Sequence, residues 1–137
     1  MDQRKLILSN EISELEKVNF ELEKLGEAWS LEPKIVFELN LVIEELITNI
    51  IFYAYEDKEE HEISVLFSKG DQSILITIYD DGKPFNPLDT QEPDDLDKPL
   101  EDRTIGGLGI HFVKTLMDQV EYTRDQEQNV LSLEKKI

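Results

Sequence analysis

The segment from Lys34 to Tyr55 constrains the fold of this 137-residue chain most strongly, because its apolar side chains recur at helical spacing. One stripe consists of Ile35, Leu39, Val42, Leu46, Ile50 and Tyr53, and it is widened by Val36, Ile43 and Ile47. A helix with so wide an apolar surface is typically buried on more than one side. The segment therefore predicts a long helix that other elements cover.

The other periodic segments predict an α+β fold of two layers. Strands are expected at Lys5–Leu8, Ile63–Ser68, Ile74–Tyr79, Val120–Thr123 and Val130–Leu133. A first helix is expected to run to about Trp29 with Ser9-Asn10-Glu11 as its cap, and another from about Gly107 to Met117. Helices and strands do not alternate regularly along the chain. This order is typical of a mixed, mostly antiparallel sheet covered on one face by about three helices. The length suits a single domain with its own core.

The charge balance restricts the classes of partner. The chain has 31 acidic and 14 basic residues, a formal net charge of −17. Such a chain repels bare nucleic acid and anionic membranes, but it can bind a nucleotide whose charge a divalent cation offsets. The negative charge either attracts a basic protein partner or only keeps the chain in solution. Cysteine is absent, which excludes disulfides and thiolate metal sites. No signal peptide or membrane-length apolar run is present, so we expect a cytoplasmic protein.

Glu45 and Asn49 are the first candidate site residues. They are four residues apart in the long predicted helix and therefore share a face. The amide oxygen of Asn49 can ligate Mg²⁺, and the carboxylate of Glu45 can accept a proton from an attacking hydroxyl group. The alternative is that Glu44 and Glu45 form the solvated edge of an amphipathic helix.

Asp80 and Gly82 follow the third predicted strand. Strand parity places Asp80 on the same face as Ile74, Ile76 and Ile78. A carboxylate at the rim of an apolar pocket can accept a hydrogen bond from the amino group of adenine, and Gly82 lets the backbone turn close to a flat ring. The alternative is an ordinary Asp-Asp-Gly turn.

A glycine-rich segment, Gly106-Gly107-Leu108-Gly109, precedes the third predicted helix. Glycines at a helix start allow backbone N–H groups to approach phosphate, although they also occur in plain loops. Arg103, just before them, can pair with a terminal phosphate or an acidic partner. The preceding stretch from Asn86 to Arg103 is acidic and proline-containing, and long loops of this kind tend to be functional. A P-loop motif is absent from the sequence.

Together these segments resemble the GHKL superfamily of ATPases and kinases. Glu45-Leu46-Ile47-Thr48-Asn49 is similar to the N box, Asp80-Asp81-Gly82-Lys83-Pro84 to the G1 box and Gly107-Leu108-Gly109 to the G2 box. The resemblance covers about residues 36–117. The short form, Asp-Arg-Thr before the glycines and Gly-Leu-Gly-Ile-His-Phe-Val at 107–113 look like the stand-alone anti-sigma factor serine/threonine kinases.

The resemblance implies one ATP-binding domain over residues 1–137, with a mobile ATP lid at about 86–105. Asn49 would hold Mg²⁺ and Glu45 would be the general base. Asp80 would read adenine beside Gly82, and Gly107, Leu108 and Gly109 would meet the phosphates. Arg103 would face the γ-phosphate or the protein substrate.

The partners that the resemblance implies are an anti-anti-sigma (STAS-domain) protein that accepts the phosphoryl group on Ser or Thr, and a sigma factor that is sequestered. It also implies a homodimer, while the net charge predicts no direct contact with nucleic acid or membrane. The alternatives are an ATP-dependent binding switch with little catalysis, a detached histidine-kinase catalytic domain, and an acidic domain without a nucleotide. One position departs from the pattern: Pro84 stands where the G1 box has glycine, which puts the hinge of the lid in question.

Overall fold

The helix predicted from the apolar stripe lies at the centre of the helical layer. The computed structural model describes residues 2–89 and 107–137, and in it α2 runs from Pro33 to Tyr53. Pro33 lies in the first turn, where its missing N–H costs no helical hydrogen bond. Eight side chains of α2 are buried, including those of Leu46 and Ile47. The wide stripe is explained by contacts with both α1 and α3 as well as with the sheet.

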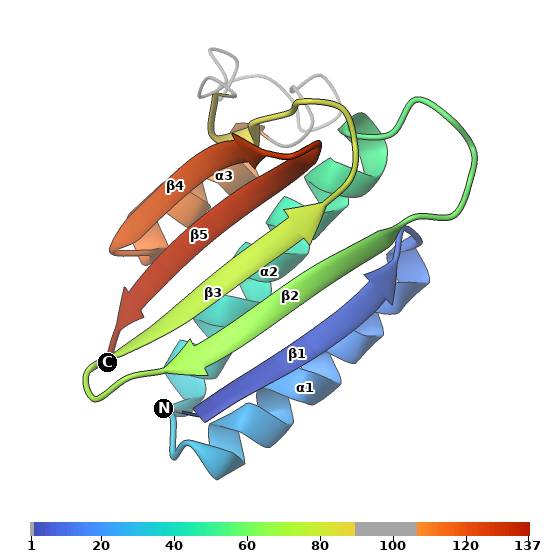
Figure 1. Cartoon of the computed structure of the whole chain (residues 1–137). Helices are drawn as coiled ribbons and strands as arrows, with labels where there is room; N and C mark the ends of the chain where they lie inside the picture. The colour runs from blue at the N-terminus through green and yellow to red at the C-terminus, as the bar shows by residue number, and fades with distance from the viewer. Residues whose placement is uncertain (1, 90–106) are drawn as a thin grey trace, which may run out of the picture.

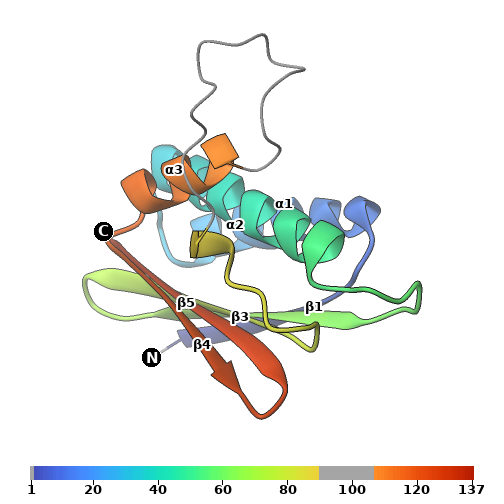
Figure 2. The ribbon, with the colours of Figure 1, turned by 90° about the horizontal axis from the view of Figure 1, so that it is seen from above.

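The strands form one open sheet in the order β1-β2-β3-β5-β4, and every neighbouring pair is antiparallel. The strands are β1 (Asp2–Ser9), β2 (Glu62–Lys69), β3 (Ser73–Asp80), β4 (Gln119–Asp125) and β5 (Gln128–Lys136). The other elements are α1 (Leu15–Ala28), α3 (Gly107–Leu116) and the 3₁₀ turns η1 (Ile12–Glu14) and η2 (Pro87–Asp89). The three α-helices cover one face of the sheet (Figures 1 and 2). The predicted two-layer α+β fold is confirmed.

The core follows the strand alternation that the sequence predicts. The buried side chains of the central strands include Ile63, Val65 and Phe67 of β2, Ile74, Ile76 and Ile78 of β3, and Leu131 and Leu133 of β5. They all point to the face that the helices cover, because successive side chains of a strand alternate between the two faces. Asp80 and Asn129 continue this inward set and are themselves buried.

The first helix starts differently from the prediction. A 3₁₀ turn precedes α1, and neither helix start has a side-chain cap. Instead, Oε1 of Glu14 accepts hydrogen bonds from the backbone N–H and the hydroxyl group of Ser9, at 2.9 and 3.1 Å. The carboxylate thus reaches back to the residue that was expected to cap the helix. Both bonds lower the pKa of Glu14, and the bond from the backbone N–H of Ser9 has the larger effect.

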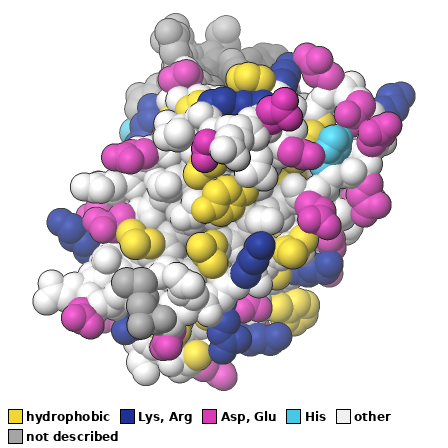
Figure 3. All heavy atoms as spheres, in the orientation of Figure 1, with side chains coloured by type: hydrophobic (Ala, Val, Ile, Leu, Met, Phe, Trp, Pro, Cys, Tyr) yellow, Lys and Arg dark blue, Asp and Glu magenta, His cyan; other side chains and the backbone are white. Residues whose placement is uncertain are grey.

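The opposite face of the sheet is open. Figure 3 shows hydrophobic and uncharged groups in the middle of this face and carboxylates mostly toward its edges. In the middle of β2 and β3 the outward positions are Ser64, Leu66, Leu75, Thr77 and Tyr79, which carry no charge at neutral pH. Among the described helices, none is long and apolar enough to cross a bilayer.

Candidate functional site

Two of the predicted site residues are neighbours on α2. Asn49 is buried, and its Nδ2 donates a hydrogen bond of 3.3 Å to Oε1 of Glu45 one turn earlier. Glu45 is half-buried, and this burial raises its pKa, while the bond from Asn49 acts in the opposite direction. The pair is therefore not a solvated helix edge. The carboxylate is less acidic than an ordinary glutamate, as a general base requires.

The glycine-rich start of α3 meets this pair. A Cβ added to Gly109 would overlap the carboxylate of Glu45, so the Glu45 side chain can occupy its observed position only because residue 109 lacks a side chain. Gly107 and Leu108 are the first two residues of the same helix. The predicted N and G2 boxes, which the sequence separates by more than fifty residues, are thus in direct contact.

Asp80 ends β3 on the buried side of the sheet. Its Oδ1 accepts hydrogen bonds of 2.9 Å from the backbone N–H of Gly82 and from Nδ2 of Asn129. Burial is the main influence on its pKa and raises it, whereas the bonds from Asn129 and Gly82 lower it. Both of these hydrogen bonds end on Oδ1, so the backbone of Gly82 and the side chain of Asn129 fix the orientation of the carboxylate.

Gly82 brings this turn against the end of α2. A Cβ on Gly82 would lie 2.5 Å from the carbonyl oxygen of Ala54, and the backbone N–H of Lys83 donates to that same oxygen at 2.8 Å. No side chain larger than hydrogen fits between the two backbones. The Asp80–Gly82 turn is therefore fixed to α2 at a point nine residues beyond Glu45, or roughly 13 Å along the helix axis.

Asn129 is the site residue that the sequence analysis missed. It is 1% exposed and lies directly opposite Asp80 in the pairing of β3 with β5. Its Nδ2 donates to Asp80 and to the carbonyl oxygen of Lys83, and its Oδ1 accepts from the backbone N–H of Phe85. Tyr122 and Arg124 of β4 also donate to Oδ1. Strand alternation could have identified Asn129 from the sequence, because this residue shares the inward face of its strand with Leu131 and Leu133.

The same network holds the turn that contains Pro84. The residues on either side of it, Lys83 and Phe85, are both held by Asn129 through their backbone groups. Arg124 adds a bond of 2.7 Å from Nη1 to the carbonyl oxygen of Gly82. None of these bonds uses the N–H of residue 84. Proline at this position therefore leaves the observed turn intact, and its fixed φ suits a turn that is already held on both sides.

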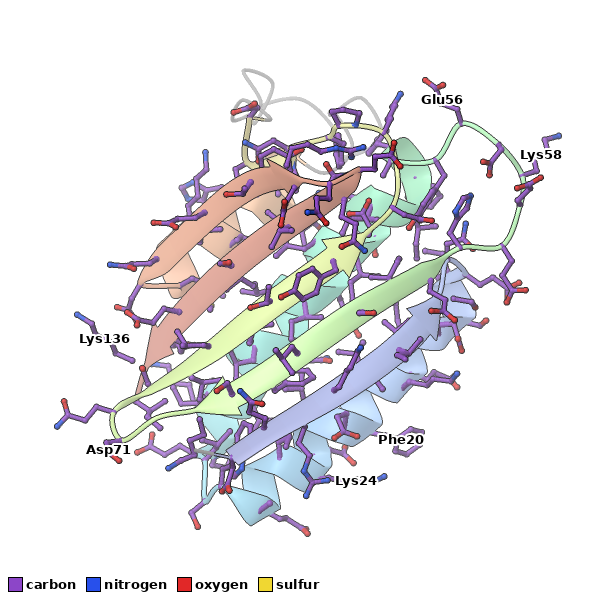
Figure 4. All side chains as sticks on the ribbon, viewed as in Figure 1. Phe20, Lys24, Glu56, Lys58, Asp71 and Lys136 are labelled. Atoms are coloured by element: carbon purple, nitrogen blue, oxygen red, sulfur yellow. The ribbon has the colours of Figure 1, made fainter. Side chains whose placement is uncertain are left out.

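The structure describes only part of the predicted phosphate side. Arg103, Gly106 and most of the predicted lid, residues 90–105, lie outside the described residues. Lys83 pairs with Glu56 at 3.1 Å, and Glu56 projects from the loop between α2 and β2 (Figure 4). Of the predicted site, the structure brings together Glu45, Asn49 and Gly109, and separately Asp80 and Gly82.

Comparison with known proteins places this geometry in context. The family model of the histidine kinase-like ATPase domain matches residues 8–135, which include both halves of the site. The "Serine-protein kinase RsbW" of Bacillus mycoides (strain KBAB4) is 31% identical over 97 residues, which cover 69% of this chain and 60% of the relative. The protein of that name from Bacillus cereus (strain AH187) gives the same identity and coverage. The chain thus spans less than two thirds of the length of these relatives.

Solved structures agree on the fold. The RsbU and RsbW domains of a Mycobacterium tuberculosis protein superpose with a TM-score of 0.65 and 10% identity, covering 98% of this chain and 32% of that one. The histidine kinase domain of a blue-light activated histidine kinase of Erythrobacter litoralis gives a TM-score of 0.52 at 13% identity, covering 90% and 59% of the two chains. At these identities the likeness concerns the arrangement of helices and strands.

Proposed function

Because the chain belongs to the histidine kinase-like ATPase domain family, we propose that it binds Mg–ATP and phosphorylates a protein on serine or threonine. The substrate in this proposal is an anti-anti-sigma (STAS-domain) protein, and the chain also sequesters a sigma factor. The observation that carries the proposal is the contact of the Glu45–Asn49 pair with Gly109 at the start of α3. The serine-protein kinase relatives support the same reaction class.

Asp80 is the proposed reader of adenine. Its carboxylate is buried and oriented through Oδ1 by Gly82 and Asn129. A carboxylate accepts hydrogen bonds and does not donate them, so it can pair with the exocyclic amine of adenine. Gly82 lies beside the ring in this arrangement.

The start of α3 is the proposed phosphate-binding element. α3 begins at Gly107, and backbone N–H groups at the start of a helix are free of helical partners. Gly107, Leu108 and Gly109 would direct these N–H groups to the phosphates. In the same proposal Arg103 contacts the γ-phosphate or the protein substrate, and the segment at about 86–105 acts as the lid of a single domain that spans residues 1–137.

Magnesium fits the donor set on α2. The amide of Asn49 donates through Nδ2 to Glu45, which leaves its oxygen as the ligand for a hard cation. Mg²⁺ bound there would neutralise charge on the phosphates during transfer. The two groups offered on α2, an oriented amide oxygen and a half-buried carboxylate, are of the oxygen-donor type that Mg²⁺ prefers.

Glu45 is the proposed general base. It takes the proton of the substrate hydroxyl group as the oxygen forms a bond to the γ-phosphorus, and the bond from that phosphorus to the β-phosphate oxygen breaks. The products are a phosphoserine or phosphothreonine and ADP. Positioning and charge neutralisation supply most of the rate in such transfers, so the contact between α2 and α3 matters as much as the base itself.

Calorimetric titration with ATP, with and without Mg²⁺, tests the first step. We expect Mg²⁺-dependent binding that Asp80→Asn weakens by roughly ten- to a hundredfold, as the loss of a charged hydrogen bond implies. Asp81→Asn is the matched control, because Asp81 is exposed and its carboxylate contacts His61. Absence of binding in the wild-type protein would refute the proposal. Binding without phosphorylation of any STAS-domain protein would instead favour the ATP-dependent switch.

A further inference from the structure

Three hollows on the helical layer are neighbours, because each shares lining residues with the next. The first, of about 490 Å³, lies between α1 and α2 near Phe37, and it shares Asn19 and Asn40 with a second of about 680 Å³. The second shares Leu15 and Glu44 with a third of about 350 Å³ between α2 and α3. We call this continuous surface the helical trough. Its lining on α1 and α2 includes the exposed side chains of Phe20, Glu23 and Phe37, which are not part of the core.

The third hollow ends at the candidate site. Its lining includes Glu45 and Gly109, the two residues whose contact joins α2 to α3. The trough is therefore not a separate surface: its inner end is formed by the proposed general base. A chain that lies in it has one end at the carboxylate that would take its proton.

Large aromatic side chains border the trough and have little cover. Phe37 is 65% exposed and Phe20 is 61% exposed. Phe20 projects sideways from α1, beyond the β1 edge of the sheet, as Figure 4 shows. Phe112 of α3 lines the inner end and is also exposed. Exposed aromatics grouped along a hollow favour a protein partner, because they gain apolar contact when it binds.

The negative charge of the trough indicates the charge of the partner segment. Glu16, Glu23, Glu27, Glu44 and Glu45 line the three hollows. Among the described residues, no lysine or arginine belongs to any of the three linings. A second copy of the chain, with 31 acidic and 14 basic residues, would bring further negative charge to this surface. A cationic segment is attracted to it.

We propose that the helical trough seats the phosphoacceptor segment of the protein substrate, and that this segment combines apolar residues with lysine or arginine. The inference rests on the proposed kinase function and adds its substrate-docking surface. Along α1 the trough extends from Leu15 to Glu27, or roughly 18 Å, which accommodates about five residues of extended chain. Apolar side chains contact the aromatics, cationic ones face the glutamates, and the hydroxyl group reaches Glu45.

The test uses a labelled peptide and its charge-reversed twin. The first, of roughly twelve residues, alternates leucine with lysine around a central serine, and the second has glutamate in place of each lysine. Fluorescence anisotropy measures their binding to the full chain without ATP. We expect the lysine peptide to bind in a salt-sensitive manner and the glutamate twin to bind at least about tenfold more weakly.

Two sets of variants locate the binding. Glu23→Lys with Glu27→Lys changes the trough far from Glu45, and it should weaken binding of the lysine peptide by roughly tenfold or more. Glu62→Lys with Glu121→Lys changes the net charge equally on the strands, and it should leave binding within about twofold of the wild type. Phe37→Ser should also weaken binding by about tenfold, because it removes apolar contact area.

Titration of Mg–ATP into the same variants separates this inference from the kinase proposal. The trough variants should bind Mg–ATP like the wild type, and the lysine peptide alone should acquire phosphate on its serine. Peptide binding without any ATP binding would support the trough and refute the kinase function. Equal binding of both peptides, equal effects of the two charge-reversed pairs, or no binding of the lysine peptide would overturn the trough. So would a dimer that Phe37→Ser dissociates, because a second copy would then be the occupant.

Discussion

Gly109 of α3 lies so close to Glu45 of α2 that the glutamate carboxylate occupies the space a Cβ would take. The two residues belong to different predicted motifs, and their contact sets the distance between the proposed base and the proposed phosphate-binding helix start. The position of the base therefore depends on the absence of a side chain at residue 109.

Gly109→Ala should displace Glu45 and lower the phosphotransfer rate by roughly tenfold or more, because small misplacements of reacting groups are costly. The free energy of unfolding should change less, since alanine favours the helix by about 1 kcal/mol and offsets part of the clash. Gly70→Ala is the matched control: a Cβ there would lie 3.8 Å from its nearest neighbour. Equal rates for the two variants would show that the contact has no catalytic role.

Glu45→Gln should lower kcat by roughly 10²- to 10⁴-fold while Mg–ATP binding persists, because the amide cannot accept the proton. The wild-type rate should rise with pH as Glu45 ionises. Since burial raises the pKa of Glu45, this rise should lie above the range of an ordinary glutamate, about 4.3. The rate of the variant should not show it. Glu21→Gln on α1 is the control for a glutamate outside the site. Full activity of Glu45→Gln would exclude Glu45 as the base.

Asn129→Ala should lower the free energy of unfolding by about 2–4 kcal/mol, because it leaves several buried polar groups without partners. Those groups include the carbonyl oxygen of Lys83 and the N–H of Phe85, while Oδ1 of Asp80 keeps only the bond from Gly82. It should also weaken ATP binding, since Asp80 loses its orientation. Urea unfolding and calorimetry measure the two effects. The neighbouring exposed residue supplies the control, Gln128→Ala, whose stability should stay near that of the wild type.

His61 should make the stability depend on pH. Asp57 and Asp81 accept hydrogen bonds from its two ring nitrogens, at 2.7 and 3.1 Å, and these carboxylates, Asp57 first, raise its pKa. A raised pKa in the folded state favours folding of the protonated form. This contribution is fully present below the unfolded pKa of about 6.5 and is lost as the pH rises through the higher folded value.

The variant His61→Gln should therefore lose stability relative to the wild type at about pH 6 and differ least above the folded pKa. Urea unfolding at several pH values measures this difference. Asp57→Asn should reproduce most of the loss, and added salt should reduce it, because the pair is near the surface. A pH-independent difference between wild type and His61→Gln would contradict the assignment.

The sequence predicted the elements of the fold well because their periods are local. The stripe from Ile35 to Tyr53 indicated α2, and the alternation around Val65 and Ile76 indicated the central hairpin. The prediction of where α1 starts was less accurate, because the carboxylate of Glu14 bonds to Ser9, which was expected to help cap the helix. Both members of the Glu45–Asn49 pair could be placed on one face from their spacing alone, and the structure confirms that they are in contact.

The sequence by itself determined which residues face inward and which segments are helix or strand, because these properties follow from periods of two and 3.6 residues. Only the tertiary structure decided which inward residues meet. Asn129 bonds Asp80 across 49 residues of sequence because the chain returns through α3 and β4 before β5 pairs with β3. Gly109 meets Glu45 because α3 packs on α2. Such contacts depend on strand register and helix packing, and a local pattern contains no information about either partner.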